Sequence, residues 1–203
     1  MNILFISLGC DKNLVDSEQM LGLLTQKGFT LTDDETQADV IVINTCCFIH
    51  DAKEESIQNI LEMAEYRKSG RCKALIVTGC LAQRYKQEII DEIEEVDAVI
   101  GTTAHDEIFE VIEKTLAGQK ELDIQDVDRL VEIDAQRVVT TGGHYAHLKI
   151  AEGCDKHCTY CIIPKIRGSY RSVPVERLLK EAQDLADQGV KELILVAQET
   201  TLY

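Results

Sequence analysis

The sequence of 203 residues lacks any apolar run long enough to cross a membrane. Its start, Met1 followed by the apolar residues Ile3–Ile6, carries no basic segment of the kind that opens a secretory signal. Basic residues are scarce, since 21 Lys and Arg stand against 36 Asp and Glu and give a net charge of −15. Broad binding to nucleic acid needs a basic face. We therefore expect a cytoplasmic protein with no membrane partner and no nonspecific binding to nucleic acid.

Eight cysteines are present, and in a cytoplasmic chain they indicate metal or redox chemistry rather than a disulfide framework. Three of them, Cys154, Cys158 and Cys161, follow a predicted strand with the spacing C-x3-C-x2-C; we call them the loop triad. Iron–sulfur clusters are usually held by four Cys, so three thiolates would leave one iron open for chemistry. The alternative is a structural zinc site in which His157 supplies a further ligand.

The segment around the loop triad is locally basic within an acidic protein. Five Lys or Arg residues occur between positions 149 and 171, against Glu152 and Asp155. Such a patch would suit an anionic cluster and its ligands. A solvated loop without a partner is the alternative.

The first part of the sequence alternates apolar, β-branched segments with amphipathic segments of helical period. Strands are expected at residues 2–7, 39–44, 74–78 and 97–101, and helices at 16–27, 51–69, 82–93 and 106–117. Continuous apolar strands that alternate with helices are typical of a parallel sheet covered on both faces. We therefore predict a doubly wound α/β domain over residues 1–118.

Residues 119–141 are acidic and lack periodicity, so we expect a linker in which a short extended segment packs on one domain. Residues 142–203 predict a strand, the cysteine loop, a helix at 175–188 and a strand at 192–197. A single βαβ unit leaves strand edges open and cannot close a barrel. We therefore expect a fragment that is cut inside its second domain; a small complete α/β protein is the alternative.

Three further cysteines directly follow predicted strands: Cys10, Cys46 and Cys80, which we call the strand-end triad. The carboxyl ends of neighbouring parallel strands share one edge, and folds of this kind place ligands there. We therefore expect the three thiols to converge on a second cluster site. Gly9 and Gly79 would let the backbone approach a bound group closely.

The other cysteines and the histidines fit no ligand pattern. Cys47 follows Cys46 directly, and adjacent side chains diverge, so both can hardly face one cluster. Cys72 precedes its strand and would lie at the opposite edge. We expect both to be structural or incidental, and we expect His144 and His147 to be surface or packing residues of a strand.

With both triads identified, the sequence resembles a known family. Ser7–Glu18, Asn44–Ile49, Ala52–Ser56 and Thr78–Tyr85 look like the amino-terminal domain of the radical S-adenosylmethionine (SAM) methylthiotransferases. Ala151–Pro164 looks like the start of their radical SAM domain, a partial TIM barrel. The resemblance covers essentially the whole chain.

Two branches of this family compete. One modifies an adenosine in tRNA, and the other modifies an aspartate of a small-subunit ribosomal protein, the twelfth. Leu8–Glu18, Ile166–Ser172 and Leu195–Thr201 resemble the second branch. That branch often has Gly where this sequence has Cys47, so which of the two adjacent thiols is the ligand stays open. An iron–sulfur or zinc binding module without catalysis is the alternative of another class.

The resemblance implies two [4Fe–4S] clusters and SAM. The loop triad would hold the cluster whose open iron binds SAM and generates a 5′-deoxyadenosyl radical, which abstracts hydrogen from the β-carbon of the target aspartate. The strand-end triad would hold an auxiliary cluster that carries the sulfur or methylthio group. This division leaves the difficult chemistry to the cofactors. Neither the electron donor nor the sulfur donor is indicated.

The resemblance also implies contacts with SAM at Tyr160, Gln198 and Glu199. For Tyr160 the alternative is an ordinary packed aromatic, and for the other two it is a solvated strand end. Further barrel strands and a carboxy-terminal nucleic-acid-binding domain, which the family has, are not found in this sequence. We therefore expect residues 1–203 alone to bind clusters and to be inactive or nearly so.

Overall fold

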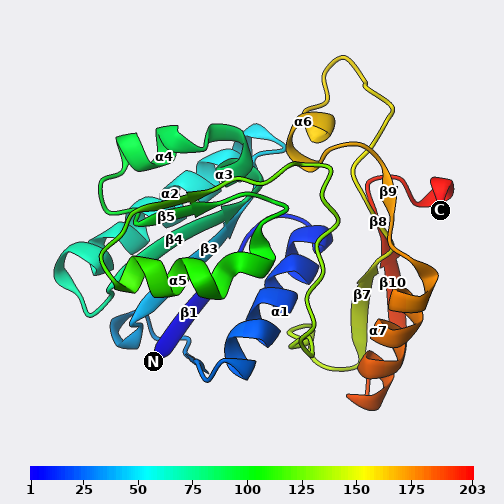
Figure 1. The fold of residues 1–203 in the computed structure, drawn as a ribbon, viewed down its shortest axis with the longest axis horizontal. Helices are drawn as coiled ribbons and strands as arrows, with labels where there is room; N and C mark the ends of the chain where they lie inside the picture. Colours follow the sequence, from blue (N-terminus) through cyan, green and yellow to red (C-terminus); the bar gives the residue numbers. More distant parts are fainter.

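Six parallel strands form the central sheet of the first part of the chain (Figure 1). The structure is a computed structural model and describes all residues, 1–203. The sheet has the order β2-β1-β3-β4-β5-β6. Its strands are β1 (Asn2–Ser7), β2 (Thr30–Leu31), β3 (Val40–Thr45), β4 (Ala74–Gly79), β5 (Ala98–Ile100) and β6 (Glu121–Asp123). The strand order reverses between β1 and β3, which creates a crevice at their carboxyl ends.

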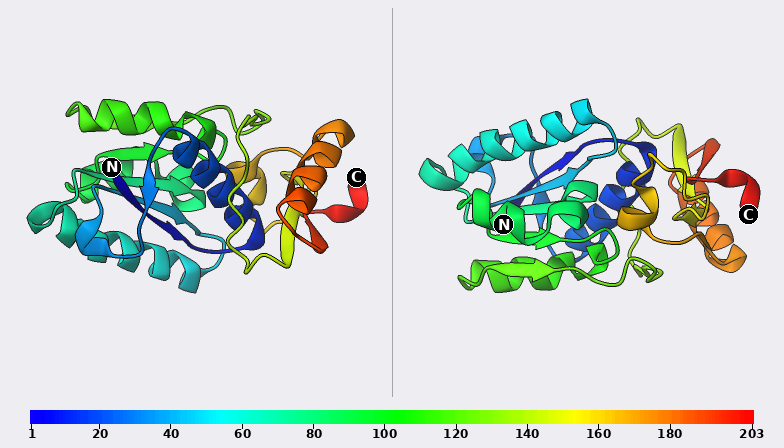
Figure 2. Two further views of the ribbon diagram at one scale, coloured as in Figure 1. Left: turned by 90° about the horizontal axis from the view of Figure 1, so that it is seen from below. Right: turned by 90° about the horizontal axis from the view of Figure 1, so that it is seen from above.

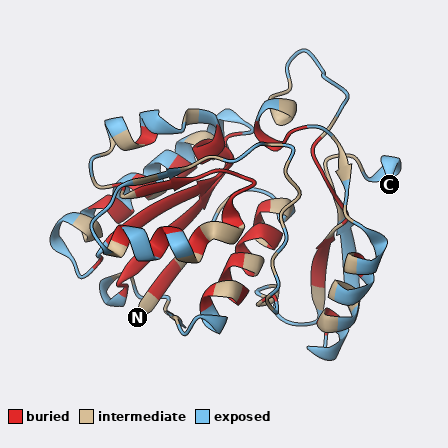
Figure 3. Ribbon diagram, in the orientation of Figure 1, coloured by how far each residue is buried: buried red, intermediate tan, exposed pale blue.

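Helices cover both faces of this sheet, as the edge-on views show (Figure 2). Residues of α1 (Asp11–Gln26) and α5 (Ile108–Leu116) pack in one apolar core, and residues of α2 (His50–Ser69), α3 (Cys80–Tyr85) and α4 (Gln87–Glu92) pack in another. The strands between the two cores are buried, because side chains from both of their faces are covered (Figure 3). No helix has both the length and the apolarity that a membrane span requires.

The second part of the chain is a small βαβ unit. Its strands β7 (Tyr145–Lys149) and β10 (Glu192–Val196) pair in parallel and are joined through α7 (Val175–Asp187). Two short strands, β8 (Ala151–Glu152) and β9 (Arg171–Ser172), pair antiparallel on either side of the cysteine loop and α6 (Ile163–Arg167). The predicted fold class, a doubly wound domain followed by a βαβ unit, is confirmed.

Several elements differ from the sequence-based expectation. Helix α1 begins at Asp11 and not at residue 16, because its first turn is held by a polar contact: the Asn13 side chain donates to the carbonyls of Leu8 and Thr45 at 3.0 and 2.9 Å. The helix expected at 82–93 is two short helices, since Lys86 between them has a φ of 48°. Apolar periodicity reports neither feature.

The stretch expected to be a linker contributes β6, which pairs with β5 at the edge of the sheet. Beyond β6 this stretch crosses α1 and reaches the second part of the chain, and Val138 N–H donates to the Glu18 carbonyl at 3.2 Å. Three one-turn 3-10 helices complete the fold: η1 (Glu35–Gln37), η2 (His105–Glu107) and η3 (Thr200–Leu202). The domain boundaries at residues 118 and 142 stay a prediction.

Candidate cluster-binding site

The strand-end triad lies at the crevice between the carboxyl ends of β1, β3 and β4. Cys10 caps the amino terminus of α1, Cys46 directly follows β3, and Cys80 is the first residue of α3. The thiols of Cys46 and Cys80 are buried, and Cys10 is exposed. The topology of the parallel sheet thus places these three residues at the same edge, beyond the carboxyl ends of their strands, as the sequence pattern predicts.

Two glycines allow the backbone to pass close to this site. Gly9 has a φ of +95°, and a Cβ at this position would lie 2.7 Å from the Cβ and 3.0 Å from the Sγ of Cys46. Gly79 has a φ of +91°, and a Cβ there would lie 2.6 Å from the carbonyl oxygen of Thr45. Any larger residue would therefore combine an unfavourable backbone conformation with a clash.

Cysteines from both triads line one cavity of about 1040 Å³. All of the strand-end triad lines it, together with Cys154 and Cys161 of the loop triad and with Gln198. Cys158 is exposed and does not line it. The structure therefore brings together five of the six predicted ligand cysteines and one of the three predicted SAM contacts.

The loop triad lies on a segment without regular structure, which projects beside α6 (Figure 1). The Cys161 N–H donates to the Cys158 carbonyl at 2.9 Å and closes a turn. Tyr160 is 88% exposed and does not line the cavity. Glu199 also lies outside the cavity lining, and its carboxylate pairs with Lys156 of this loop.

The donor set fits an iron–sulfur cluster. All eight cysteines are free thiols, and soft thiolates are the usual ligands of such clusters. The structure contains no group of three or more Cys, His, Asp or Glu residues placed to hold a single metal ion. A zinc site at the loop triad would need ligand atoms roughly 2.3 Å from one ion. A cluster of several irons spans more space, so thiols spread around a common cavity suit it better.

Cys47 and Cys72 lie away from the cavity. Cys47 is in the apolar core between the sheet and α2, and its Sγ lies 3.2 Å from the Cys80 carbonyl oxygen. The Cys72 Sγ contacts the Ala74 carbonyl oxygen at 3.2 Å. Burial raises the pKa of both thiols. Their placement favours Cys46 over Cys47 as the residue that faces a bound group.

A buried charged network next to the cavity is a feature that the sequence analysis missed. It joins the first part of the chain to the second through Asp16, Lys149, Glu152 and Arg167. Arg167 donates to Asp16 at 2.8 Å and to Glu152 at 3.2 Å, and Lys149 pairs with both carboxylates. The basic patch seen in the sequence is thus largely neutralised by ion pairs.

Electrostatics within this network keep the carboxylates ionised. Burial raises the pKa of Glu152, but the charges of Lys149 and Arg167 outweigh burial and lower that pKa to about 2. The pKa of Asp16 is lowered for the same reasons. Burial raises the pKa of the nearby Cys80 to about 12, although the charge of Arg167 opposes this effect. Without a bound group the Cys80 thiol is therefore neutral.

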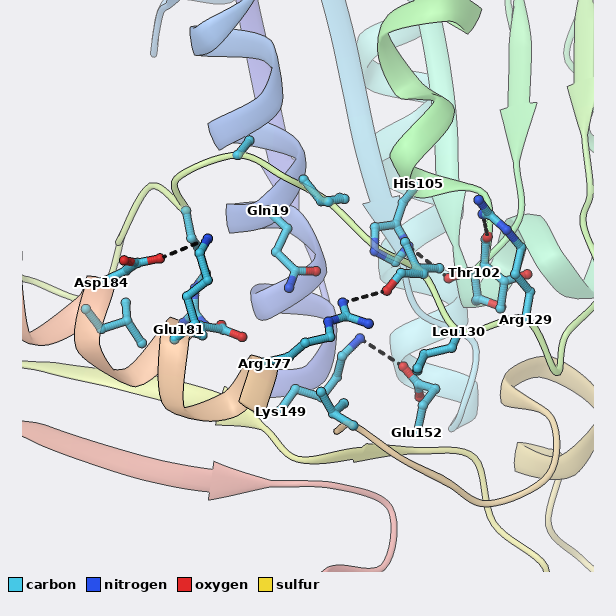
Figure 4. A pocket seen from close by; sticks show the side chains of 18 of the residues that line it. Gln19, Thr102, His105, Arg129, Leu130, Lys149, Glu152, Arg177, Glu181 and Asp184 are labelled. Atoms are coloured by element: carbon cyan, nitrogen blue, oxygen red, sulfur yellow. Dashed lines mark hydrogen bonds and ion pairs between the residues drawn. The ribbon is translucent and has the colours of Figure 1, made fainter. Parts of the chain in front are cut away.

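A second, polar cavity of about 140 Å³ adjoins the network between α1, α7 and the segment 129–137 (Figure 4). Lys149 and Glu152 line it, together with His105. His105 is buried, and its Nδ1 lies 3.0 Å from the Thr102 carbonyl oxygen while its Nε2 has no partner. Burial lowers the pKa of His105, so the imidazole is neutral.

Comparisons with known proteins match the two parts of the chain to different families. The model of the uncharacterized protein family UPF0004 matches residues 2–101, and that of the Radical SAM superfamily matches residues 148–203. The first match contains the strand-end triad and the second contains the loop triad. The two triads thus come from two different family segments that meet at one cavity.

The particular relatives are proteins named ribosomal protein uS12 methylthiotransferase RimO. The chain is 70% identical to that of Lachnoclostridium phytofermentans over all 203 residues, which is 46% of that protein. It is 56% identical to that of Acetivibrio thermocellus, with 98% of this chain and 45% of the relative covered. The chain spans about half the length of the curated relatives it matches. The resemblance to the radical SAM methylthiotransferases, and to their ribosomal-protein branch, is confirmed.

Proposed function

We propose that this chain supplies the cluster-binding part of a methylthiotransferase that acts on the β-carbon of an aspartate in ribosomal protein uS12. The observation that carries the proposal is one cavity lined by all three cysteines of the strand-end triad and by Cys154 and Cys161 of the loop triad. The names of the relatives supply the substrate. A site for one cluster alone would not need five cysteines, from two separate parts of the chain, around one volume.

When bound, two [4Fe–4S] clusters and SAM would supply radical cleavage of a C–H bond and the methylthio group. The chain's own residues would hold and shield these groups. The strand-end triad would hold the auxiliary cluster on the edge of a rigid sheet, with Cys46 rather than Cys47 as the ligand from β3. Apolar residues that line the cavity would keep water from it: Leu8, Phe48, Ile49, Ile163 and Ala197.

Counting iron tests the two sites. After anaerobic reconstitution with iron and sulfide, we expect about eight irons per chain, four for each [4Fe–4S] cluster. Cys10→Ala and Cys154→Ala should each remove about half. Cys72→Ala is the matched control, because this thiol is buried away from the cavity. An unchanged iron count in Cys10→Ala would refute the auxiliary site.

The substrate is tested with the full protein, supplied with SAM, sulfide and a low-potential reductant. Mass spectrometry of uS12 should show a methylthio group on one aspartate. The matched reaction contains tRNA in place of uS12. Modification of tRNA adenosine without modification of uS12 would assign the protein to the other branch.

A further inference from the structure

Arg167 is a buried arginine in contact with a predicted cluster ligand. Its side chain is 2% exposed, and it lines the large cavity at the end of α6. Its Nε–H donates to the Sγ of Cys80, with 3.3 Å between the two atoms. Among the six predicted ligand cysteines, Cys80 is the one whose sulfur accepts a hydrogen bond from a side chain.

The guanidinium group is held in this orientation by the rest of the network. Its Nη1 donates to Asp16 and Glu152, and its Nη2 donates to the Asn13 side chain. Because the group is planar and all three nitrogens are engaged, the Nε–H cannot turn away from Cys80 without breaking these bonds. Arginine keeps its charge at every pH at which the protein folds. A fixed positive donor therefore points at one ligand sulfur.

We propose that Arg167 tunes the auxiliary cluster by donating a charge-assisted hydrogen bond to the Cys80 thiolate, which raises the reduction potential of that cluster. The inference rests on the proposed function, in which the strand-end triad holds a cluster. Hydrogen bonds to ligand sulfurs and nearby charge set the potential of iron–sulfur clusters. The reduced cluster carries one more negative charge than the oxidised one. A fixed cationic donor therefore stabilises the reduced form more.

The contacts of Arg167 also predict that it raises the reduction potential of the auxiliary cluster and not that of the loop-triad cluster. Glu152 accepts a hydrogen bond from Gln198 at 2.8 Å and precedes Cys154 of the loop triad by two residues. Through Glu152, Arg167 is thus joined to the backbone that carries the second site. Yet it makes no hydrogen bond to any sulfur of the loop triad. We therefore expect Arg167 to separate the potentials of the two clusters.

The test measures the potential of the auxiliary cluster alone. The parent is the full chain with all three loop-triad cysteines changed to Ala, reconstituted anaerobically. The variant adds Glu152→Gln and Arg167→Gln together, so that the network loses one charge of each sign relative to the parent and keeps its charge balance. A chemical reductant supplies the electron, and electron paramagnetic resonance follows the reduced cluster. Arg167→Lys in the parent background keeps the positive charge but lacks the planar guanidinium group. It is the variant to measure if the Gln variant does not fold.

We expect the variant to bind four irons, as the parent does. At the parent's midpoint potential, its ratio of oxidised to reduced cluster should rise at least tenfold, which corresponds to a potential lower by about 59 mV for one electron. The Lys variant should shift in the same direction by less. A ratio within twofold of the parent in the variant that folds would overturn the proposal.

Iron loss confined to the Arg167 variants would also overturn the proposal, since the residue would then be needed to hold the cluster and not to tune it. Failure of the parent itself to bind iron is a different result. It would refute the auxiliary site and with it the proposed function. The iron content of the parent therefore distinguishes failure of this proposal from failure of the proposed function.

Discussion

The two cysteine triads are held in very different ways. Cys46 and Cys80 of the strand-end triad follow strands whose residues are all buried in a six-stranded sheet, and Cys10 precedes the first residue of α1, so the backbone fixes their positions before any ligand arrives. The loop triad lies on a segment without helix or strand, and Cys158 points to solvent. Ordering a free segment costs conformational entropy that a bound group must offset. One site is thus preorganised by the fold, and the other is completed by what it binds.

The two halves of the chain also differ in their cores. The first half contains two apolar cores of 18 and 13 buried residues, the larger of which includes Ile166 of the second half, whereas each core within the second half has three. Buried ion pairs join the halves, and breaking such a pair leaves an uncompensated charge. The second half is therefore held in position by these buried ion pairs together with the packing of Ile166 in the larger core of the first half.

The largest effect is expected from Glu18→Ala. This carboxylate is fully buried, and it accepts hydrogen bonds from Arg137 at 2.7 Å and from the Thr140 N–H at 2.6 Å. Its loss should lower the free energy of unfolding by about 3–5 kcal/mol, because the buried Arg137 loses its fully buried partner and keeps only Glu181, and the Thr140 N–H loses its acceptor. Urea denaturation measures the change.

Asp134→Ala is the matched control for that experiment. Asp134 is fully exposed, and its carboxylate lies 4.0 Å from Lys180. An exposed pair contributes at most about 1 kcal/mol, so this variant should unfold nearly as the parent does. Equal effects in both variants would show that the halves do not rely on the buried pair.

A smaller effect is expected from Gly79→Ala, which should lower the free energy of unfolding by about 3 kcal/mol. The new Cβ would clash with the Thr45 carbonyl, and an alanine would also be strained at the positive φ of this position. Gly189→Ala is the matched control, since Gly189 has a φ of +102° and no atom within 4 Å of its Cβ position. That control should lose about 1 kcal/mol. Similar losses in both would mean that the strand-end site is more adaptable than its packing indicates.

Cluster loading should affect the two triads unequally. We expect reconstitution to slow amide exchange or proteolysis within residues 154–162 on the order of tenfold, because this exposed segment has few backbone hydrogen bonds before its thiols bind a cluster. Exchange in β3 and β4 should change little, since these strands are already buried. Equal protection of both regions would show that the two triads are preorganised to the same extent.

The smallest effect on stability is expected from Tyr160→Ala. A side chain that is 88% exposed should change the free energy of unfolding by no more than about 0.5 kcal/mol. If Tyr160 contacts SAM, as the family resemblance implies, the Kd of SAM for the reconstituted chain should rise on the order of tenfold. Unchanged SAM affinity would remove Tyr160 from the binding site.

The sequence predicted the parts of the site that depend on backbone topology. Cysteines that directly follow strands converge because parallel strands share one edge, and this rule needs no knowledge of side-chain packing. Arg167 was not predicted, because α6 is only five residues long and its partners lie far away in the chain. The first turn of α1 was missed for a related reason: Asn13 is buried as a polar residue, and apolar periodicity cannot report it.

The bond between Asp16 and Arg167 closes a separation of 151 residues. Contacts of such high sequence separation form late, because the entropy of closing a long loop must first be offset. During synthesis, Cys10, Cys46 and Cys80 and the strands that precede them all emerge before Arg167. We therefore expect a kinetic order in which the sheet and its thiols form first and the arginine docks afterwards. Pulsed hydrogen exchange during refolding would contradict this order if β7 gained protection before β3.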